Sequence, residues 1–331
     1  MRVSIAGAGI VGLTCAWWLQ EAGHEVTVYD PSPGTGASYA AAGMIAPAGE
    51  AWYGEETLLR LGLASAALWP SFAERIGVPL GQDGAVLVAR DASDLAVVRR
   101  SVELLARCGV PVSDVDVLDL EPTLSDRVVG GAWLPTDSSV DPRVVTATLL
   151  GLLDGRVVRE PAPPYVTVRC TGGAAHPSIH PVRGEILRIR SDDPPRRVVR
   201  GLVHGEAVYL VPRDDGEVVV GATSEHRTGP LLPTVGGVAR LLDAARALVP
   251  SLEQAAVLEV LARDRPGTPD NGPLLGRLPT GELIAAGHHR GGVLLAPITA
   301  TAVLALVEGT APPPETLPFH PSRFDQEVSP A

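Results

Sequence analysis

The amino-acid sequence predicts an α/β fold, α+β overall, in which a Rossmann-like domain is joined to a second domain built on an antiparallel sheet. Three observations predict it. The chain opens as strand, glycine-rich turn, helix and strand, which is the start of a βαβ unit. Segments of alternating polarity between residues 183 and 221 are typical of antiparallel strands. A length of 331 residues also exceeds what one hydrophobic core normally serves, so we expect two domains.

The first elements are the most regular part of the sequence. Arg2–Ala6 is a short apolar run that predicts a strand, and Ile10–Ala22 continues with helical spacing until Gly23 closes the segment. His24–Tyr29 then alternates as a second strand that ends at Asp30. Together these segments predict a complete βαβ opening.

Later segments continue the pattern of helices and strands. Glu55–Ile76 has helical spacing, and Pro70 is expected to kink or divide that helix. Asp141 followed by Pro142 is typical of a helix N-terminus. Further strands are expected at residues 183–190, 207–211, 217–221 and 283–286, and further helices at 144–153, 238–249 and 297–308.

Composition and charge exclude several classes of protein. The net charge of −11 argues against a nucleic-acid partner, because phosphate binding needs clustered positive charge. All 27 basic residues are arginine, so Schiff-base chemistry on lysine and a P-loop lysine are excluded. The three cysteines, Cys15, Cys108 and Cys170, are too widely spaced for a disulfide framework or a zinc site, and we expect no metal.

The sequence also lacks a membrane signal. No apolar run reaches the roughly 18 residues that a transmembrane helix needs. The first residues read as a strand rather than as a signal peptide. We therefore expect a cytoplasmic protein without a membrane partner.

The turn after the first strand contains the pattern Gly-x-Gly-x-x-Gly. In a βαβ unit, the first glycine permits the tight turn, the second lets the backbone approach a pyrophosphate, and the third allows close helix packing. An acidic residue at the end of the next strand accepts from a ribose hydroxyl. The pattern alone does not separate FAD from NAD, and a glycine-rich turn without a ligand is the alternative. The residues expected to hold the dinucleotide are Gly7, Gly9, Ile10, Val11, Gly12 and Asp30.

Four further blocks resemble the glycine-oxidising branch of the D-amino-acid oxidase family of FAD-dependent oxidoreductases. They span nearly the whole chain in the family's order. They are residues 36–47, residues 209–212 with 219–223, residues 265–268 with 272–276, and residues 287–297. The resemblance implies a Rossmann-like FAD-binding domain at residues 1–80, 140–178 and 263–331, and a substrate domain at residues 81–139 and 179–262.

The resemblance also implies that FAD is bound non-covalently. Backbone N–H groups of the block at residues 287–297 would lie along the isoalloxazine ring, where they stabilise the negative charge that accumulates on reduction. The positions that match flavin contacts of the family are Ser38, Ala41, Ala42, Gly43, Met44, Val158, Gly291, Gly292, Val293 and Leu294.

Three side chains match the substrate site of the family. Arg265 matches the arginine that binds the substrate carboxylate, and Tyr209 matches the tyrosine that helps to hold it. Arg290 matches a second arginine near the flavin and the entrance. Ala46 and Ser224 match positions that border the pocket for the substrate side chain.

The implied reaction is the oxidative deamination of glycine or another small amino acid, such as sarcosine or a small D-amino acid. The products are a 2-oxo acid, ammonia and hydrogen peroxide, with dioxygen as the second substrate. Family membership also implies a role in making the thiazole of thiamine. Oligomeric state is left open, with a homo-oligomer as one outcome.

Several alternatives remain. Within the family, the chain could be a D-amino-acid oxidase or dehydrogenase of different substrate range, or a sarcosine-type oxidase, although no cysteine beyond Cys170 is available for covalent flavin. A nicotinamide-dependent dehydrogenase would share the βαβ opening but not the later blocks. A flavin-binding protein without turnover is a third alternative. The adjacent His288 and His289 are assigned to packing and loop support, because neighbouring side chains in an extended segment point apart.

Overall fold

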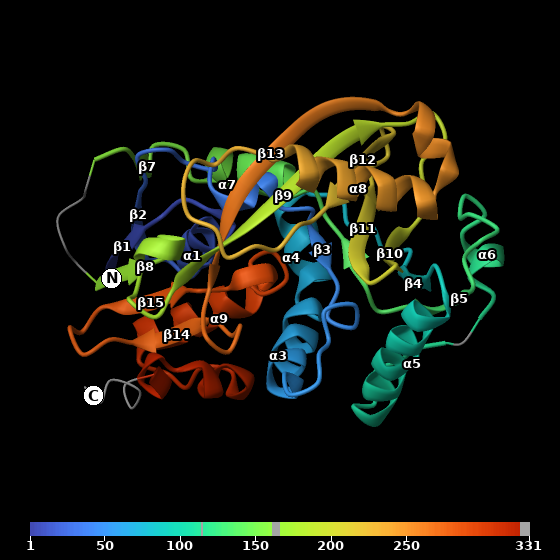
Figure 1. The fold of residues 1–331 in the computed structure, drawn as a ribbon. Coiled ribbons are helices and arrows are strands. Elements are labelled where there is room, and N and C mark those ends of the chain that lie inside the picture. The colour runs from blue at the N-terminus through green and yellow to red at the C-terminus, as the bar shows by residue number, and fades with distance from the viewer. Residues whose placement is uncertain (114, 161–165, 325–331) are drawn as a thin grey trace, which may run out of the picture.

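The computed structural model describes residues 1–113, 115–160 and 166–324. Its strands form two large sheets and one short pair, β3 (Met44–Ile45) with β6 (Ser138–Ser139). In Figure 1, the first sheet lies on the left beside the N-terminus and the second lies at the upper right. The predicted mixture of parallel and antiparallel sheets is confirmed.

The first sheet is the predicted Rossmann-like element. Its central strands are parallel, and β1 pairs with β2 on one side and with β8 on the other. Buried apolar side chains of this sheet form one core with those of the helices α1 (Ile10–Glu21), α7 (Pro142–Leu152) and α9 (Ala296–Glu308). The strand order is β14 (Leu274–Arg277), β15 (Leu283–Ala286), β8 (Val166–Arg169), β1 (Arg2–Ala6), β2 (Glu25–Tyr29) and β7 (Val157–Val158).

Local signals place the ends of the helices as the sequence predicts. The expected long helix is divided into α3 (Glu56–Ala66) and α4 (Trp69–Ile76), and Pro70 lies in the first turn of α4. Asp141 caps α7, because its carboxylate accepts the backbone N–H of Arg143 at 2.8 Å. Gly309 ends α9 with a φ of 73°, which a glycine adopts without strain.

The second sheet contains the predicted antiparallel strands and forms its own core. The helix α8 (Val235–Leu248) packs on one face with buried valines and leucines of the strands. The strand order is β13 (Ala256–Gly267), β9 (His180–Arg190), β12 (Glu217–Gly221), β11 (Glu206–Pro212), β10 (Val198–Val203), β4 (Ala85–Ala89) and β5 (Gly130–Leu134). The remaining helices are α2 (Ala37–Ala40), α5 (Ala92–Arg107) and α6 (Val117–Leu120).

Two long elements were not predicted. The helix α5 carries a clear signal that was overlooked, because Asp91 accepts the backbone N–H groups of Ser93 and Asp94 as an N-cap. The strand β13 carries almost no signal, since its residues are mostly half-buried or exposed and do not alternate. Its partner β9 explains its length, because the two strands pair from Ala256 to Gly267.

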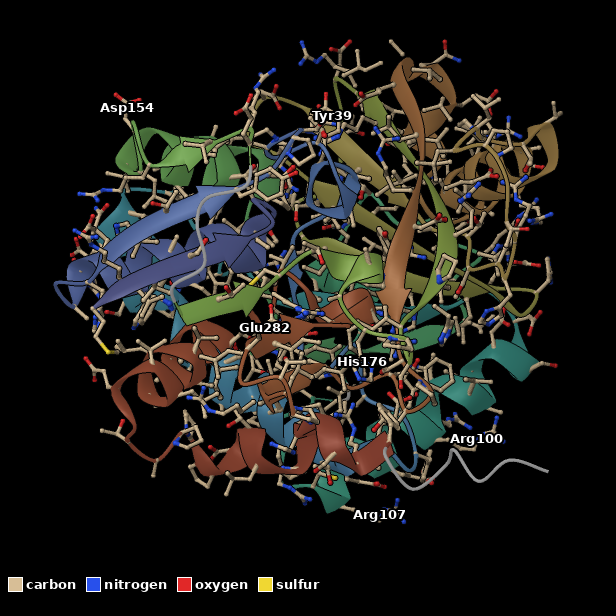
Figure 2. All side chains as sticks on the ribbon, turned by 90° about the vertical axis from the view of Figure 1, so that its left-hand side faces the viewer. Tyr39, Arg100, Arg107, Asp154, His176 and Glu282 are labelled. Carbon is tan, nitrogen blue, oxygen red and sulfur yellow. The ribbon has the colours of Figure 1, made fainter. Side chains whose placement is uncertain are left out.

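The strand β13 connects the two sheets. Figure 1 shows it arching from the second sheet toward the first, and residues 263–267 remain paired with β9 beyond the predicted domain boundary. On its other side, the Tyr39 hydroxyl contacts Glu259 of β13 at 3.5 Å, and Figure 2 shows Tyr39 between the two parts of the molecule. The assignment of residues to two domains stays a prediction.

No helix within the described ranges is both long and apolar enough to span a bilayer.

Candidate active site

A cavity of about 680 Å³ lies between the two sheets. This volume is within the usual range of small-molecule and cofactor sites. Its walls come from segments that are far apart in the sequence, namely the loops after β1, β2 and β8, the strands β9, β11 and β13, and the turn between β15 and α9. The cavity therefore brings together the glycine loop, the block at residues 36–47, the block at residues 287–297 and side chains of the second sheet.

The glycine loop forms one end of the cavity, and two of its glycines are sterically required. Gly7 has a φ of 106°, and a Cβ there would lie 2.5 Å from the carbonyl oxygen of Cys170. A Cβ on Gly12 would lie 2.0 Å from the carbonyl oxygen of Gly7. Gly7, Gly9, Ile10 and Val11 line the cavity, whereas Gly12 serves the packing of α1 against the loop.

Asp30 and Ser38 complete this end. The Asp30 carboxylate lines the cavity and accepts the backbone N–H groups of Ala8 at 2.7 Å and Ser32 at 2.8 Å. The Ser38 hydroxyl accepts the N–H of Ile10 at 3.0 Å, in the first turn of α1. The unpaired N–H groups and the dipole at a helix N-terminus favour an anionic group such as a pyrophosphate.

We expect the Asp30→Ala variant to bind FAD about tenfold more weakly, because it loses one charged acceptor for the ribose. Titration of apoprotein with FAD, followed by quenching of flavin fluorescence, would measure the affinity. Asp30→Asn keeps an acceptor oxygen for the loop and is the control for loop support. An unchanged FAD affinity of a folded Asp30→Ala protein would contradict the assignment.

Val158 lies outside this arrangement. It sits on β7 at the edge of the first sheet, where its carbonyl oxygen accepts the N–H of Asp30 at 3.0 Å. Its side chain is half-buried and does not line the cavity. Its predicted contact with the adenine stays a prediction, since the neighbouring residues 161–165 lie outside the described part of the chain.

The turn at residues 291–294 forms the middle of the cavity wall. Its end is held by the Leu294 carbonyl oxygen, which accepts the Ser65 hydroxyl at 2.6 Å and the Trp69 indole N–H at 3.0 Å. The N–H groups of Val293 and Leu294 have no hydrogen-bond partner in the described chain, although both residues are buried. Unpaired donors beside the N-terminus of α9 fit the electron-rich edge of a flavin ring.

The segment from Ala40 to Met44 also lines the cavity. Gly43 has a φ of 82°, and its carbonyl oxygen accepts the N–H of Val140 at 2.9 Å. A Cβ at Gly43 would lie 1.8 Å from the carbonyl oxygen of Val140, so only glycine fits. The predicted Ala41, Ala42, Gly43 and Met44 all line the cavity.

Tyr209 and Arg265 project into the cavity from the second sheet. The Tyr209 ring lies over Gly221, and the Arg265 guanidinium lies over Gly184, where a Cβ would be 2.5 Å from its Nη1. Arg265 also donates from Nη1 to the Thr223 carbonyl oxygen at 3.1 Å. Burial raises the pKa of Tyr209, and the nearby charge of Arg265 works in the opposite direction. The two strands thus place a neutral phenol and a guanidinium side by side.

Arg290 is already paired with two carboxylates. Its Nε lies 3.0 Å from Glu50 and its Nη2 lies 3.5 Å from Glu55. The other oxygen of Glu50 accepts from Arg200 at 2.8 Å. Burial opposes the charge of Glu50, but Arg200 and Arg290 outweigh it and hold the pKa of that carboxyl below its ordinary value. Arg265, in contrast to Arg290, has no carboxylate partner among the described residues.

Sequence reasoning missed Glu50 and Arg200, and two of its minor assignments do not reach the cavity. Glu50 lies three residues after the block at residues 36–47, which was an available signal, whereas nothing in the sequence marks Arg200. Ala46 is buried and Ser224 is exposed, and neither lines the cavity.

The two adjacent histidines differ. His288 is buried, and its Nε2 lies 3.0 Å from the Thr299 hydroxyl of α9, as expected for a packing role. Both residues line the cavity, but neither ring nitrogen of His289 has a hydrogen-bond partner among the described residues. Burial lowers the pKa of His288 to about 4, so its ring is neutral at neutral pH.

This buried ring predicts an acid-sensitive stability. The unfolded imidazole titrates near its ordinary pKa of 6.5, so unfolding takes up a proton between about pH 4 and 6.5. The free energy of unfolding therefore falls as the pH drops through that window. We expect His288→Asn, which cannot titrate, to shrink the difference in unfolding free energy between pH 7 and pH 5 by about 2 kcal/mol. Urea unfolding of both proteins at the two pH values would measure it, and an unchanged difference would contradict the neutral buried ring.

Comparison with known proteins agrees with this geometry. A family model described as FAD dependent oxidoreductase matches residues 2–306. The chain is 34% identical to a putative thiamine biosynthesis oxidoreductase ThiO of Rhizobium etli, covering 92% of this chain and 95% of that protein. It is 30% identical to the bifunctional protein ThiO/ThiG of Trichormus variabilis, covering 99% of this chain but 56% of that protein's length. The crystal structure of glycine oxidase from Geobacillus kaustophilus superimposes with a TM-score of 0.88 at 28% identity, covering 96% of this chain and 98% of that chain.

Proposed function

Because the chain belongs to the D-amino-acid oxidase family of FAD-dependent oxidoreductases, we propose that it oxidatively deaminates glycine or another small amino acid. The products are a 2-oxo acid, ammonia and hydrogen peroxide. The observation that carries the proposal is the meeting of Arg265 and Tyr209 in the cavity that also receives the glycine loop. This combination suits a small carboxylate held against a dinucleotide.

FAD fits the residues that line this cavity. The glycine loop with Asp30 and Ser38 would hold the adenosine ribose and pyrophosphate, and the unpaired N–H groups of Val293 and Leu294 would face the flavin ring. When bound, FAD supplies the hydride acceptor and passes the electrons to dioxygen. The residues of the chain bind and orient the amino acid.

The side chains at the other end orient the amino acid. The planar guanidinium of Arg265 can bind both oxygens of the carboxylate, and the Tyr209 hydroxyl can donate to one of them. Anchoring the carboxylate fixes the α-carbon and its hydrogen toward the turn at residues 291–294. Both oxygens of Glu50 already accept from arginines, so no free carboxylate faces the α-carbon from this residue. Orientation rather than acid–base catalysis is therefore the main contribution of these residues.

One experiment tests the proposed function against its alternatives. The purified protein, loaded with FAD, is supplied with glycine, sarcosine, D-alanine and bulkier D-amino acids, and peroxide release is measured. Peroxide from glycine or another small substrate supports the proposal. Turnover only with bulky D-amino acids would favour a D-amino-acid oxidase, flavin reduction without peroxide would favour a dehydrogenase, and no reduction by any substrate would leave a flavin-binding protein without turnover.

We also propose that the protein acts in thiamine biosynthesis. Two similar proteins carry names from thiamine biosynthesis, which supports a role in supplying the imine for the thiazole ring. We also propose that the enzyme is cytoplasmic, and the net charge of −11 supports the absence of a nucleic-acid partner. Deleting the gene should then create a growth requirement for thiamine or its thiazole, and normal growth without either would contradict this role.

A further inference from the structure

The side chain of His289 lies on the cavity wall without a hydrogen-bond partner. It begins a short 3₁₀ turn with a backbone φ of 47°, and both of its ring nitrogens are buried. Among the described side chains that line the main cavity, no other has buried polar atoms without a partner. Native proteins rarely leave such groups unpaired, so the ring offers a donor and an acceptor to whatever occupies the cavity.

His289 belongs to the substrate end of the cavity. The charges of Arg290, Arg265 and Glu50 all act on its ring. The residue also lines a small adjoining cavity of about 40 Å³, which it shares with Glu50, Glu55 and Arg290. Since Arg265 is the proposed anchor of the substrate carboxylate, the ring lies near the rest of a small amino acid bound there.

The ring is neutral under ordinary conditions. Burial lowers the pKa of His289 to about 4, and the neighbouring Arg290 and Arg265 add to the effect. A neutral imidazole carries one N–H donor and one nitrogen with a free lone pair. The His289 ring therefore offers the cavity an uncharged acceptor close to Arg265 and Arg290.

An amino acid needs such an acceptor. Arg265 and Tyr209 can satisfy its carboxylate, but its amino group presents N–H donors that require a partner of their own. The carboxylate of Glu50 is already held by Arg200 at 2.8 Å and by Arg290 at 3.0 Å. The His289 ring, in contrast, has a lone pair that no described donor uses.

We propose that the His289 ring accepts a hydrogen bond from the amino group of the substrate while Arg265 and Tyr209 hold its carboxylate. The charges of the neighbouring Arg265 and Arg290 disfavour the ammonium form of the amine, and an uncharged acceptor offsets this effect less than a carboxylate would. The neutral amine is the form whose lone pair can assist loss of the hydride from the α-carbon. His289 thereby selects substrates that carry both a carboxylate and an amine, and this selection rests on the proposed function.

The test compares a ligand that has an amine with one that lacks it. Glycine binding is measured from flavin reduction under anaerobic conditions, and acetate binding from the change it causes in the flavin spectrum. His289→Gly removes the ring and relieves the positive φ, whereas His289→Asn keeps a donor and an acceptor and tolerates this φ. We expect His289→Gly to weaken glycine about tenfold and acetate less than about twofold, and His289→Asn to recover most of the loss.

The outcomes separate this inference from the proposed function. Equal weakening of glycine and acetate, or unchanged glycine binding in His289→Gly, would overturn the role of His289 alone. A wild-type flavin that no amino acid reduces would overturn the proposed function and this inference with it. If the glycine variant loses FAD, His289→Leu fills the space without a polar atom and carries the same expectation.

Discussion

We expect the Arg265→Lys variant to lose roughly a hundredfold in kcat/KM for glycine and to keep its FAD spectrum. Lysine preserves the charge but not the planar fork that binds both carboxylate oxygens. The structure adds a second reason, because the Arg265 guanidinium lies flat over Gly184 while it donates to the Thr223 carbonyl oxygen at 3.1 Å. A single ammonium group cannot reproduce that position and still reach the substrate.

Steady-state kinetics and the flavin absorption spectrum should be recorded from one preparation. The loss should come mostly from weaker substrate binding, and therefore appear in KM. Arg277→Lys is the control, since Arg277 is exposed on β14 and donates to backbone carbonyls away from the cavity. An Arg265→Lys enzyme with near-normal KM would show that the carboxylate is held elsewhere, and Arg290 would then be the first candidate.

The second large effect concerns the flavin wall. We expect Gly43→Ala to destabilise the protein by about 3 kcal/mol or more and to reduce the bound FAD. Gly43 has a φ of 82°, which strains any residue with a Cβ, and the new methyl group would lie 1.8 Å from the Val140 carbonyl oxygen. The backbone has to move at Gly43 or at Val140. Gly43 directly precedes β3 and Val140 directly follows β6, its partner strand.

Gly23→Ala is a closely matched control for this variant. Gly23 has a φ of 84°, but no atom lies within 4 Å of the Cβ position. It should therefore cost only the backbone strain, about 1 kcal/mol, and leave FAD binding intact. Thermal unfolding and the flavin content of both variants would measure the difference. Equal destabilisation of the two variants would show that the contact with Val140 does not constrain the flavin wall.

Much of the fold could be read from local patterns. The βαβ opening, the division of the helix at Pro70 and the cap at Asp141 depend on residues within a few positions of one another. The glycine loop and the blocks at residues 36–47 and 287–297 are also contiguous, so their place at the cavity follows from the order of the first strands and helices. Local periodicity and short motifs encode such features directly.

The sequence by itself therefore determined the Rossmann-like opening, the family and the candidates Arg265 and Tyr209. Only the tertiary structure decided which charges meet. Glu50 and Arg200 are 150 positions apart, and their ion pair exists because the segment after β3 lies beside β10. Glu50 also pairs with Arg290, whereas Arg265 has no carboxylate partner and His289 no hydrogen-bond partner among the described residues. The physical reason is that strand order and register place these side chains, and no local pattern reports which distant strands become neighbours.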